Sequence, residues 1–237
     1  MTDDEKRFCE LAERAWSRSI RVFSEFLPLD TQGELARMRL PVPVTFEGGC
    51  ENAERRVAVF EGGAGGSAPI ACIKITPGRF ASPLTHRDCL GALMGLGIKR
   101  SMLGDIVVGG ECCWLFCLEQ IADFILTELV SVGREHVSTE RTAPPESAMR
   151  PPEQTEVVVS SERLDALVSA VYRVSRSESR LLCESGRVFI NGKETLEASR
   201  MPDAGDVISV RGSGRFIYDG VSRETRKGRL RALVRIY

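Results

Sequence analysis

Residues 175–192 read SRSESRLLCESGRVFING. This stretch contains signals for the start and the end of one short helix and for the turn that follows it. Ser175 and Glu178 have the spacing of a capping box, which favours a helix that begins here. Gly186 is the residue type that ends many helices, because it adopts the left-handed conformation without strain. Asn191-Gly192 is a strong signal for a tight turn between antiparallel strands. The stretch therefore predicts a helix, a strand over 187–190 and a hairpin turn, in that order.

The flanking residues extend this unit in both directions. An apolar helix face, with spacing i, i+3, i+4 and i+7, precedes the stretch and consists of Leu164, Leu167, Val168 and Val171. After the stretch, Gly205-Asp206 predicts a turn before a strand over 207–211. We therefore expect two short helices followed by a small sheet.

Arginines gather on the same stretch. Arg176 and Arg180 lie four residues apart, so they share a face of the predicted helix. Arg173 precedes that helix, and Arg187 directly follows Gly186. Guanidinium groups match phosphate oxygens in geometry, and a capped helix N-terminus adds amide donors. The arrangement would suit an RNA backbone.

The charge distribution points to the same part of the chain. Residues 1–160 carry a net charge of −6, whereas residues 161–237 carry +5. From Val207 to Tyr237 there are eight basic residues and two acidic ones. A basic segment on an acidic body predicts a local polyanion site, which the whole-chain charge of −1 would not indicate.

The composition is that of an ordinary globular protein. Of the 237 residues, 43% are hydrophobic and 27% are charged. No apolar run reaches the roughly 18 residues that span a bilayer, and the acidic N-terminus is unlike a signal peptide. We expect a cytoplasmic protein that has no membrane partner.

Metal, redox and catalytic motifs are weak. The eight cysteines include no Cys-x-x-Cys pair, and there are only two histidines, so neither a metal site nor a disulfide scaffold is expected. His86-Arg87-Asp88 copies a protein-kinase tripeptide, but the other kinase motifs are missing. Arg163-Leu164-Asp165 is similar to a pseudouridine-synthase motif, but the residues that follow it differ. We predict no catalytic residue, no cofactor and no small-molecule substrate.

Two breaks divide the chain. Residues 142–155 are rich in proline and lack apolar periodicity, which is typical of a linker, and the glycine run at 61–67 predicts a flexible turn. The expected parts are an N-terminal α/β segment (1–66), a domain like an RNA-recognition motif (67–141), the linker (142–155), the helix-and-sheet domain (156–222) and a basic tail (223–237).

The first two parts have distinct patterns. Residues 1–66 predict helices over 3–23 and 32–39 and strands over 42–46 and 56–60. Residues 67–141 predict strands over 69–75, 105–108, 112–118 and 136–140, with helices over 86–96 and 120–132. The order β-α-β-β-α-β is that of ferredoxin-like and RNA-recognition-motif domains, so the fold class is α+β. Trp114 and Phe116 are the only aromatic residues available to that sheet, and we assign no base stacking to them.

The C-terminal motifs resemble a known RNA-binding domain. Residues 163–167, 175–180, 186–192 and 205–208 are similar to the S-four domain, named after a ribosomal small-subunit protein. The resemblance implies that the helix pair and the following loop bind structured RNA. The expected contacts, with Arg173 added from the arginine cluster, are Arg163, Arg173, Arg176, Ser177, Arg180, Arg187, Asn191 and Lys193.

For three of these residues a structural role is an alternative to RNA contact. Asn191 would serve only to form the turn, and Arg163 would pair with Glu162 or Glu184. Arg180 would pair with Glu184, four residues further along the same helix.

The resemblance extends over most of the chain. Residues 48–56, 84–100, 104–106 and 209–215 are similar to the YlmH family, bacterial proteins in which an RNA-recognition-like region precedes an S-four domain. The linker and the tail depart from that pattern. The resemblance implies binding of rRNA or tRNA on large ribosomal subunits, in rescue of stalled translation.

We therefore expect a non-enzymatic RNA-binding protein of the ribosome, acting in quality control of stalled large subunits or in ribosome assembly. One alternative is an RNA-modifying enzyme of the pseudouridine-synthase or methyltransferase type. Another is a protein-interaction adaptor, because residues 1–160 are acidic and would repel RNA.

Overall fold

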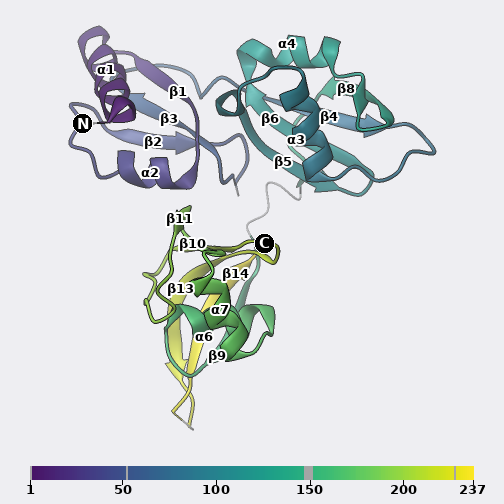
Figure 1. The fold of residues 1–237 in the computed structure, drawn as a ribbon. Coiled ribbons are helices and arrows are strands. Elements are labelled where there is room, and N and C mark those ends of the chain that lie inside the picture. The colour runs from purple at the N-terminus through teal and green to yellow at the C-terminus, as the bar shows by residue number, and fades with distance from the viewer. Residues whose placement is uncertain (1, 52, 147–151, 227) are drawn as a thin grey trace. The chain divides into compact units, whose positions relative to one another are not determined.

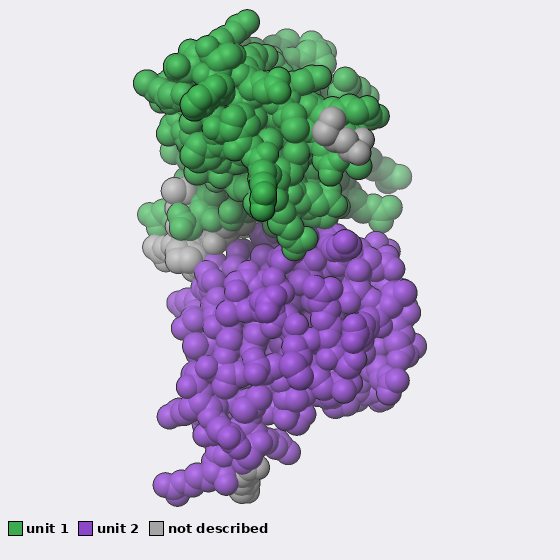
Figure 2. Space-filling view, turned by 90° about the vertical axis from the view of Figure 1, so that its left-hand side faces the viewer, with its two compact units in different colours: residues 1–151 green, residues 152–237 purple. Residues whose placement is uncertain are grey.

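The computed structural model describes residues 2–51, 53–146, 152–226 and 228–237. The chain divides into two compact units, Met1–Pro151 and Pro152–Tyr237 (Figure 2). The predicted linker at 142–155 spans this division, and its residues 147–151 lie outside the described residues.

The first half of unit 1 is a small antiparallel sheet with two helices (Figure 1). Its strands are in the order β1-β3-β2. The elements are α1 (Asp3–Arg18), β1 (Arg21–Leu27), α2 (Leu29–Leu35), β2 (Val44–Glu47) and β3 (Arg56–Glu61). Phe8 and Ala12 of α1 pack with Ala58 and Phe60 of β3 in one buried cluster.

The predicted first helix is too long. It was expected to reach Phe23, but α1 ends at Arg18, and Ser19 adopts a left-handed conformation with φ of 52°. The chain then forms β1, in which burial alternates along the strand. Ile20 and Phe23 are three residues apart, a spacing that fits the apolar face of a helix. In a short run this spacing does not distinguish a helix from a strand, so the two residues extended the predicted helix too far. The second helix lies at 29–35 rather than 32–39.

The glycine run at 61–67 has a packing reason. A Cβ atom on Gly62 would lie 2.0 Å from the carbonyl oxygen of Ala15, and one on Gly63 would lie 2.0 Å from that of Ser19. Only glycine permits the backbone to pass so close to the end of α1. The run is therefore a close backbone contact as well as a turn.

The second half of unit 1 has the predicted ferredoxin-like topology. Its elements are β4 (Ile70–Pro77), α3 (His86–Gly95), a short helical turn (Arg100–Met102), β5 (Leu103–Gly109), β6 (Cys112–Leu118), α4 (Glu119–Glu128), β7 (Ser131–Val132) and β8 (Glu135–Arg141). The sheet order is β5-β6-β4-β8-β7, with every pairing antiparallel. Leu93 of α3 and Ile125 of α4 pack with Ile73 and Leu115 of the sheet. The predicted α+β class is confirmed.

The other face of this sheet is partly covered by the first half of the unit. Phe116 of β6 is fully buried with Phe26 of β1 and Val57 of β3. Arg55 donates hydrogen bonds to the carbonyl oxygens of Leu103 and Phe26, at 2.9 and 3.0 Å. Phe116 is therefore a core residue, and it cannot stack with an RNA base in this conformation.

Unit 2 is a six-stranded antiparallel sheet with two helices (Figure 1). Its elements are β9 (Gln154–Val159), α6 (Leu164–Tyr172), α7 (Arg176–Glu184), β10 (Val188–Ile190), β11 (Lys193–Glu194), β12 (Val207–Val210), β13 (Gly214–Glu224) and β14 (Leu230–Ile236). The sheet order is β11-β10-β12-β13-β14-β9. Leu167 and Cys183 of the helices pack with Ile208 and Phe216 of the sheet.

Residues 223–237, which the sequence set apart as a basic tail, belong to this sheet. Strand β14 pairs with β13 on one side and with β9 on the other. Ala232 and Val234 are fully buried, Arg231 and Arg235 flank them, and Leu233 between them is half-buried. Buried and half-buried positions therefore alternate with the period of a strand that has one buried face, a pattern that the net charge concealed. Lys227 lies outside the described residues.

A charge pair joins strands β13 and β14. Arg235 of β14 donates from Nε and Nη2 to the two carboxylate oxygens of Asp219, both at 2.7 Å. Gln154 of β9 donates to the same carboxylate at 3.0 Å. The bond to Arg235 lowers the pKa of Asp219 below its ordinary value.

We expect Asp219→Asn to lower the free energy of unfolding at pH 7 by about 1 kcal/mol, because it removes a partly buried charge pair. A carboxyl group with a lowered pKa in the folded state stabilises above its unfolded pKa of about 3.9, and this contribution is lost as pH falls through the folded value. The difference from wild type in urea unfolding should therefore shrink below about pH 4. Asp203→Asn, at an exposed turn carboxylate, is the control, and an equal loss in both variants would contradict the prediction.

Candidate nucleic-acid interface

The helix pair of unit 2 meets at a short turn. Helix α6 ends at Tyr172, and the capping residue Arg173 adopts a left-handed conformation with φ of 54°. Helix α7 begins after Ser175, whose side chain accepts a hydrogen bond from the backbone N–H of Glu178 at 3.1 Å. The predicted helix start is thus correct, and the tight turn brings the N-terminus of α7 close to α6.

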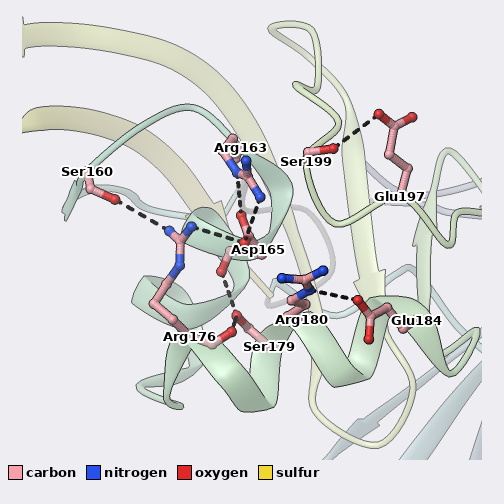
Figure 3. Close-up of polar contacts among 9 residues, drawn as sticks. All are labelled: Ser160, Arg163, Asp165, Arg176, Ser179, Arg180, Glu184, Glu197 and Ser199. Atoms are coloured by element: carbon pink, nitrogen blue, oxygen red, sulfur yellow. Dashed lines mark hydrogen bonds and ion pairs between the residues drawn. The ribbon is translucent and has the colours of Figure 1, made fainter.

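A buried carboxylate lies at the centre of this corner. Asp165, in the first turn of α6, is 4% exposed. Arg163 donates from Nε and Nη2 to its two oxygens at 3.2 and 3.3 Å, and Nη2 of Arg176 lies 3.0 Å from Oδ2 (Figure 3). One carboxylate therefore positions guanidinium groups from the start of both helices. We call these three residues the Asp165 clamp.

The clamp is tied to the backbone and open to solvent. The hydroxyl of Ser179 donates to the carbonyl oxygen of Asp165 at 2.7 Å, which fixes α7 against α6. The side chains of Arg163 and Arg176 remain 39% and 45% exposed. Both guanidinium groups can therefore contact a ligand without leaving Asp165.

Asp165 was missed as a positioning residue by sequence reasoning, which considered it only as a catalytic candidate. Arg163 was expected to pair with Glu162 or Glu184, but Glu162 accepts a hydrogen bond from the hydroxyl of Tyr218, and Glu184 pairs with Arg180. A signal was present, because Asp165 lies beside the apolar face of α6, where a carboxylate requires partners.

Arg180 does not join the clamp. Its Nε lies 2.7 Å from Oε1 of Glu184, the alternative pairing considered for it, and this bond raises the pKa of Arg180. Figure 3 shows the two side chains together on α7, apart from Arg163 and Arg176. Ser177 shares a hydrogen bond with Ser175 at 3.0 Å, and Arg173 is exposed at the turn. These residues flank the clamp.

The remaining predicted contacts lie at the strands. Arg187 donates from Nη2 to the carbonyl oxygen of Arg211 at 2.7 Å. Asn191 has φ of 50°, donates to Asp206 at 2.7 Å and accepts from the backbone of Val207 at 2.9 Å. Both ends of its amide are thus used within the protein, as the turn-forming alternative requires. Lys193 is exposed on β11.

The described residues offer neither a cluster of metal ligands nor a helix that could cross a membrane. No group of three or more His, Cys, Asp and Glu side chains in the described ranges is placed to hold a metal ion. Across the same ranges, no helix is both long and apolar enough to cross a membrane.

Two parts of the chain match known protein families. Residues 69–145 match the family described as "Putative RNA-binding domain in YlmH", and residues 162–208 match the S4 domain, the S-four type predicted above. The predicted resemblance to the YlmH family is confirmed. The S4 match contains the whole clamp and ends within β12, so β13 and β14 lie beyond it.

Two individual proteins are similar to this chain. One is the Ribosome-associated protein quality control protein P2 of Bacillus subtilis (strain 168), 29% identical over 242 residues, covering 96% of this chain and 93% of that protein. The other is a solved structure, the cell division protein ylmH from Streptococcus pneumoniae. It has a TM-score of 0.48 and 18% identity, and it covers 63% of this chain and 97% of that one.

Asp165→Asn should lower the free energy of unfolding of this protein by about 1–3 kcal/mol, because its charge-assisted hydrogen bonds lose their acceptor charge in a buried position. Urea unfolding measures the change. Glu184→Gln is the matched control, since it breaks an exposed i,i+4 pair and should cost only a few tenths of a kcal/mol. A loss for Asp165→Asn no larger than that of the control would show that the clamp does not hold the corner.

Proposed function

We propose that this protein binds structured RNA of the ribosome (rRNA, tRNA or both) through the Asp165 clamp, and acts on large subunits in rescue of stalled translation or in assembly. We further propose that it is a bacterial, cytoplasmic protein. The observation that carries the proposal is the clamp itself: two guanidinium groups, positioned by one buried carboxylate, present their outer edges to solvent.

The chemistry of the clamp suits phosphate. A guanidinium fork can donate two parallel hydrogen bonds to a phosphate, and a fork that is already positioned loses less side-chain entropy on binding. The N-terminus of α7 adds backbone donors on the same side, beside Ser177. Arg173, at the end of α6, and Arg180, on α7, are further cations of the helix pair, and Arg180 is paired with Glu184. Arg187 and Lys193 lie at the strands and are the outlying members of the proposed contacts. Structured RNA presents a regular array of phosphates to such a surface.

The comparisons support the ribosome as the source of this RNA. The Bacillus subtilis relative is named for ribosome-associated quality control, and it aligns with this chain over nearly its whole length. The two matched domains include one described as RNA-binding.

We propose that binding requires no chemistry by the protein. Asp88, part of the kinase-like tripeptide, accepts a hydrogen bond from the hydroxyl of Thr85 at the start of α3. Asp165, the aspartate of the synthase-like motif, is held by two arginines. Mass spectrometry of rRNA and tRNA nucleosides after incubation with the protein tests this, and a new modified nucleoside would support the RNA-modifying alternative.

Arg176→Ala should weaken binding to large subunits by about 1–3 kcal/mol. The slope of the logarithm of the binding constant against the logarithm of the salt concentration should also become shallower, by roughly 0.7–0.9 for each phosphate that is no longer neutralised. Arg176→Lys keeps the charge but loses the fork, so it should recover the slope more fully than the affinity. Both are measured by co-sedimentation over a range of salt concentrations. Arg229→Ala, at the exposed turn between β13 and β14, is the control. If folded Arg176→Ala binds with the affinity and slope of wild type, the clamp is not the RNA site.

A further inference from the structure

The sheet of unit 2 has a second face, which no helix of the described residues covers. Strand side chains alternate between faces, and Val188, Val210, Phe216 and Val234 point to the helices, because all four belong to the buried cluster with α6 and α7. The residues next to them in sequence therefore point away from the helices. This outer face is distinct from the Asp165 clamp.

One cross-strand row on the outer face contains two aromatic rings. Phe189 of β10 pairs with Ser209 of β12, and Ser209 pairs with Arg215 of β13. The backbone N–H of Tyr237, directly after β14, donates to the carbonyl oxygen of Arg215 at 3.1 Å. Four neighbouring strands thus place Phe189, Ser209, Arg215 and Tyr237 side by side.

An arginine lies over each ring. The guanidinium carbon of Arg211 is 5.3 Å from the ring centroid of Phe189, and that of Arg215 is 4.1 Å from the ring centroid of Tyr237. Both distances are within the range of cation–π contacts. Tyr237 is 43% exposed, and Arg211 is exposed. The row therefore presents flat groups of two kinds, aromatic and guanidinium, to solvent.

Positive charge predominates around the row. Arg187 lies beside Arg211, to whose carbonyl oxygen it donates. Among the described side chains next to the row, Glu194 lies opposite Phe189 on the edge strand β11, and Asp219 of β13 is paired with Arg235. Arg187 and Arg211 are two cations against the one carboxylate of Glu194, so they leave the Phe189 end of the row with positive charge. The side chain of Ser209 between the two stacks is small, so the row is not blocked at its centre.

We propose that this outer row, defined as Arg187, Phe189, Ser209, Arg211, Arg215 and Tyr237, binds unpaired bases of single-stranded RNA. Bases that are not in a duplex stack on aromatic rings and guanidinium planes, and nearby arginines meet their phosphates. A double helix offers no free base faces, and a protein interface has a core depleted of charge, so both fit this row less well. The site goes beyond the function proposed for the clamp and shares with its predicted contacts only Arg187.

The test measures the full-length protein by fluorescence anisotropy with two labelled RNAs, an oligouridine of about ten nucleotides and a blunt RNA duplex. Phe189→Leu combined with Tyr237→Leu removes both rings but keeps apolar volume. We expect it to weaken oligouridine binding by about fivefold or more for each ring and to change duplex binding less than about twofold. Phe80→Leu is the matched control, because Arg79 lies 5.7 Å from that ring on an exposed site in unit 1.

A second variant keeps the proposal testable if the double variant does not fold. Arg211→Gln removes one guanidinium plane from an exposed position and should weaken oligouridine binding, while Arg229→Gln, at the exposed turn between β13 and β14, should leave it unchanged. Wild type that does not bind oligouridine, or folded row variants that bind it as tightly as wild type, would overturn the proposal. So would an equal loss in Phe80→Leu. If the folded row variants bind oligouridine normally but no longer co-sediment with ribosomes, the row is instead a protein-facing surface.

Discussion

The buried carboxylate of Asp165 is the constraint on which the helix corner of unit 2 depends. A carboxylate in this position would be costly without partners, and Arg163 and Arg176 satisfy it from the starts of two different helices. Ser179 adds a bond to the backbone of the same residue. Core packing and surface charge are thus linked through one side chain: the helices that bury the apolar face also hold the guanidinium groups in place for an anion.

The sheet of unit 2 contains strands that lie outside the matched S4 segment. Strands β13, β14 and β9 extend the sheet, and the bond between Asp219 and Arg235 joins two of them. A sheet with helices on one side necessarily has an opposite side, and here that side carries arginine–aromatic stacks. Unit 2 therefore offers two chemically different surfaces, one suited to phosphates in structured RNA and one suited to unpaired bases.

Unit 1 shows that topology and surface chemistry are separate properties. Its second half has the strand order of a ferredoxin-like domain, yet Phe116 on the face away from α3 and α4 is buried by Phe26 and Val57 from the first half. The bonds of Arg55 to backbone carbonyl oxygens hold the two halves together. Trp114 is left as the only aromatic residue of β6 that is not fully buried. Strand β6 therefore does not present a stacking pair on the pattern of RNA-recognition motifs, although the fold would allow one.

Local signals in the sequence determined much of this protein, because caps, tight turns and apolar periodicity act over a few residues. They predicted the start of α7 at Ser175, the Asn191-Gly192 turn and the element order of 67–141. Tertiary structure alone decided the pairing of Arg176 with Asp165 across two helices, the burial of Phe116 and the place of β14 between β13 and β9. These features depend on interactions between residues that are distant in the chain. The hydrogen bond from Arg231 of β14 to Glu156 of β9, for example, joins residues 75 positions apart. No short-range pattern records which distant strand or side chain will complete such an interaction.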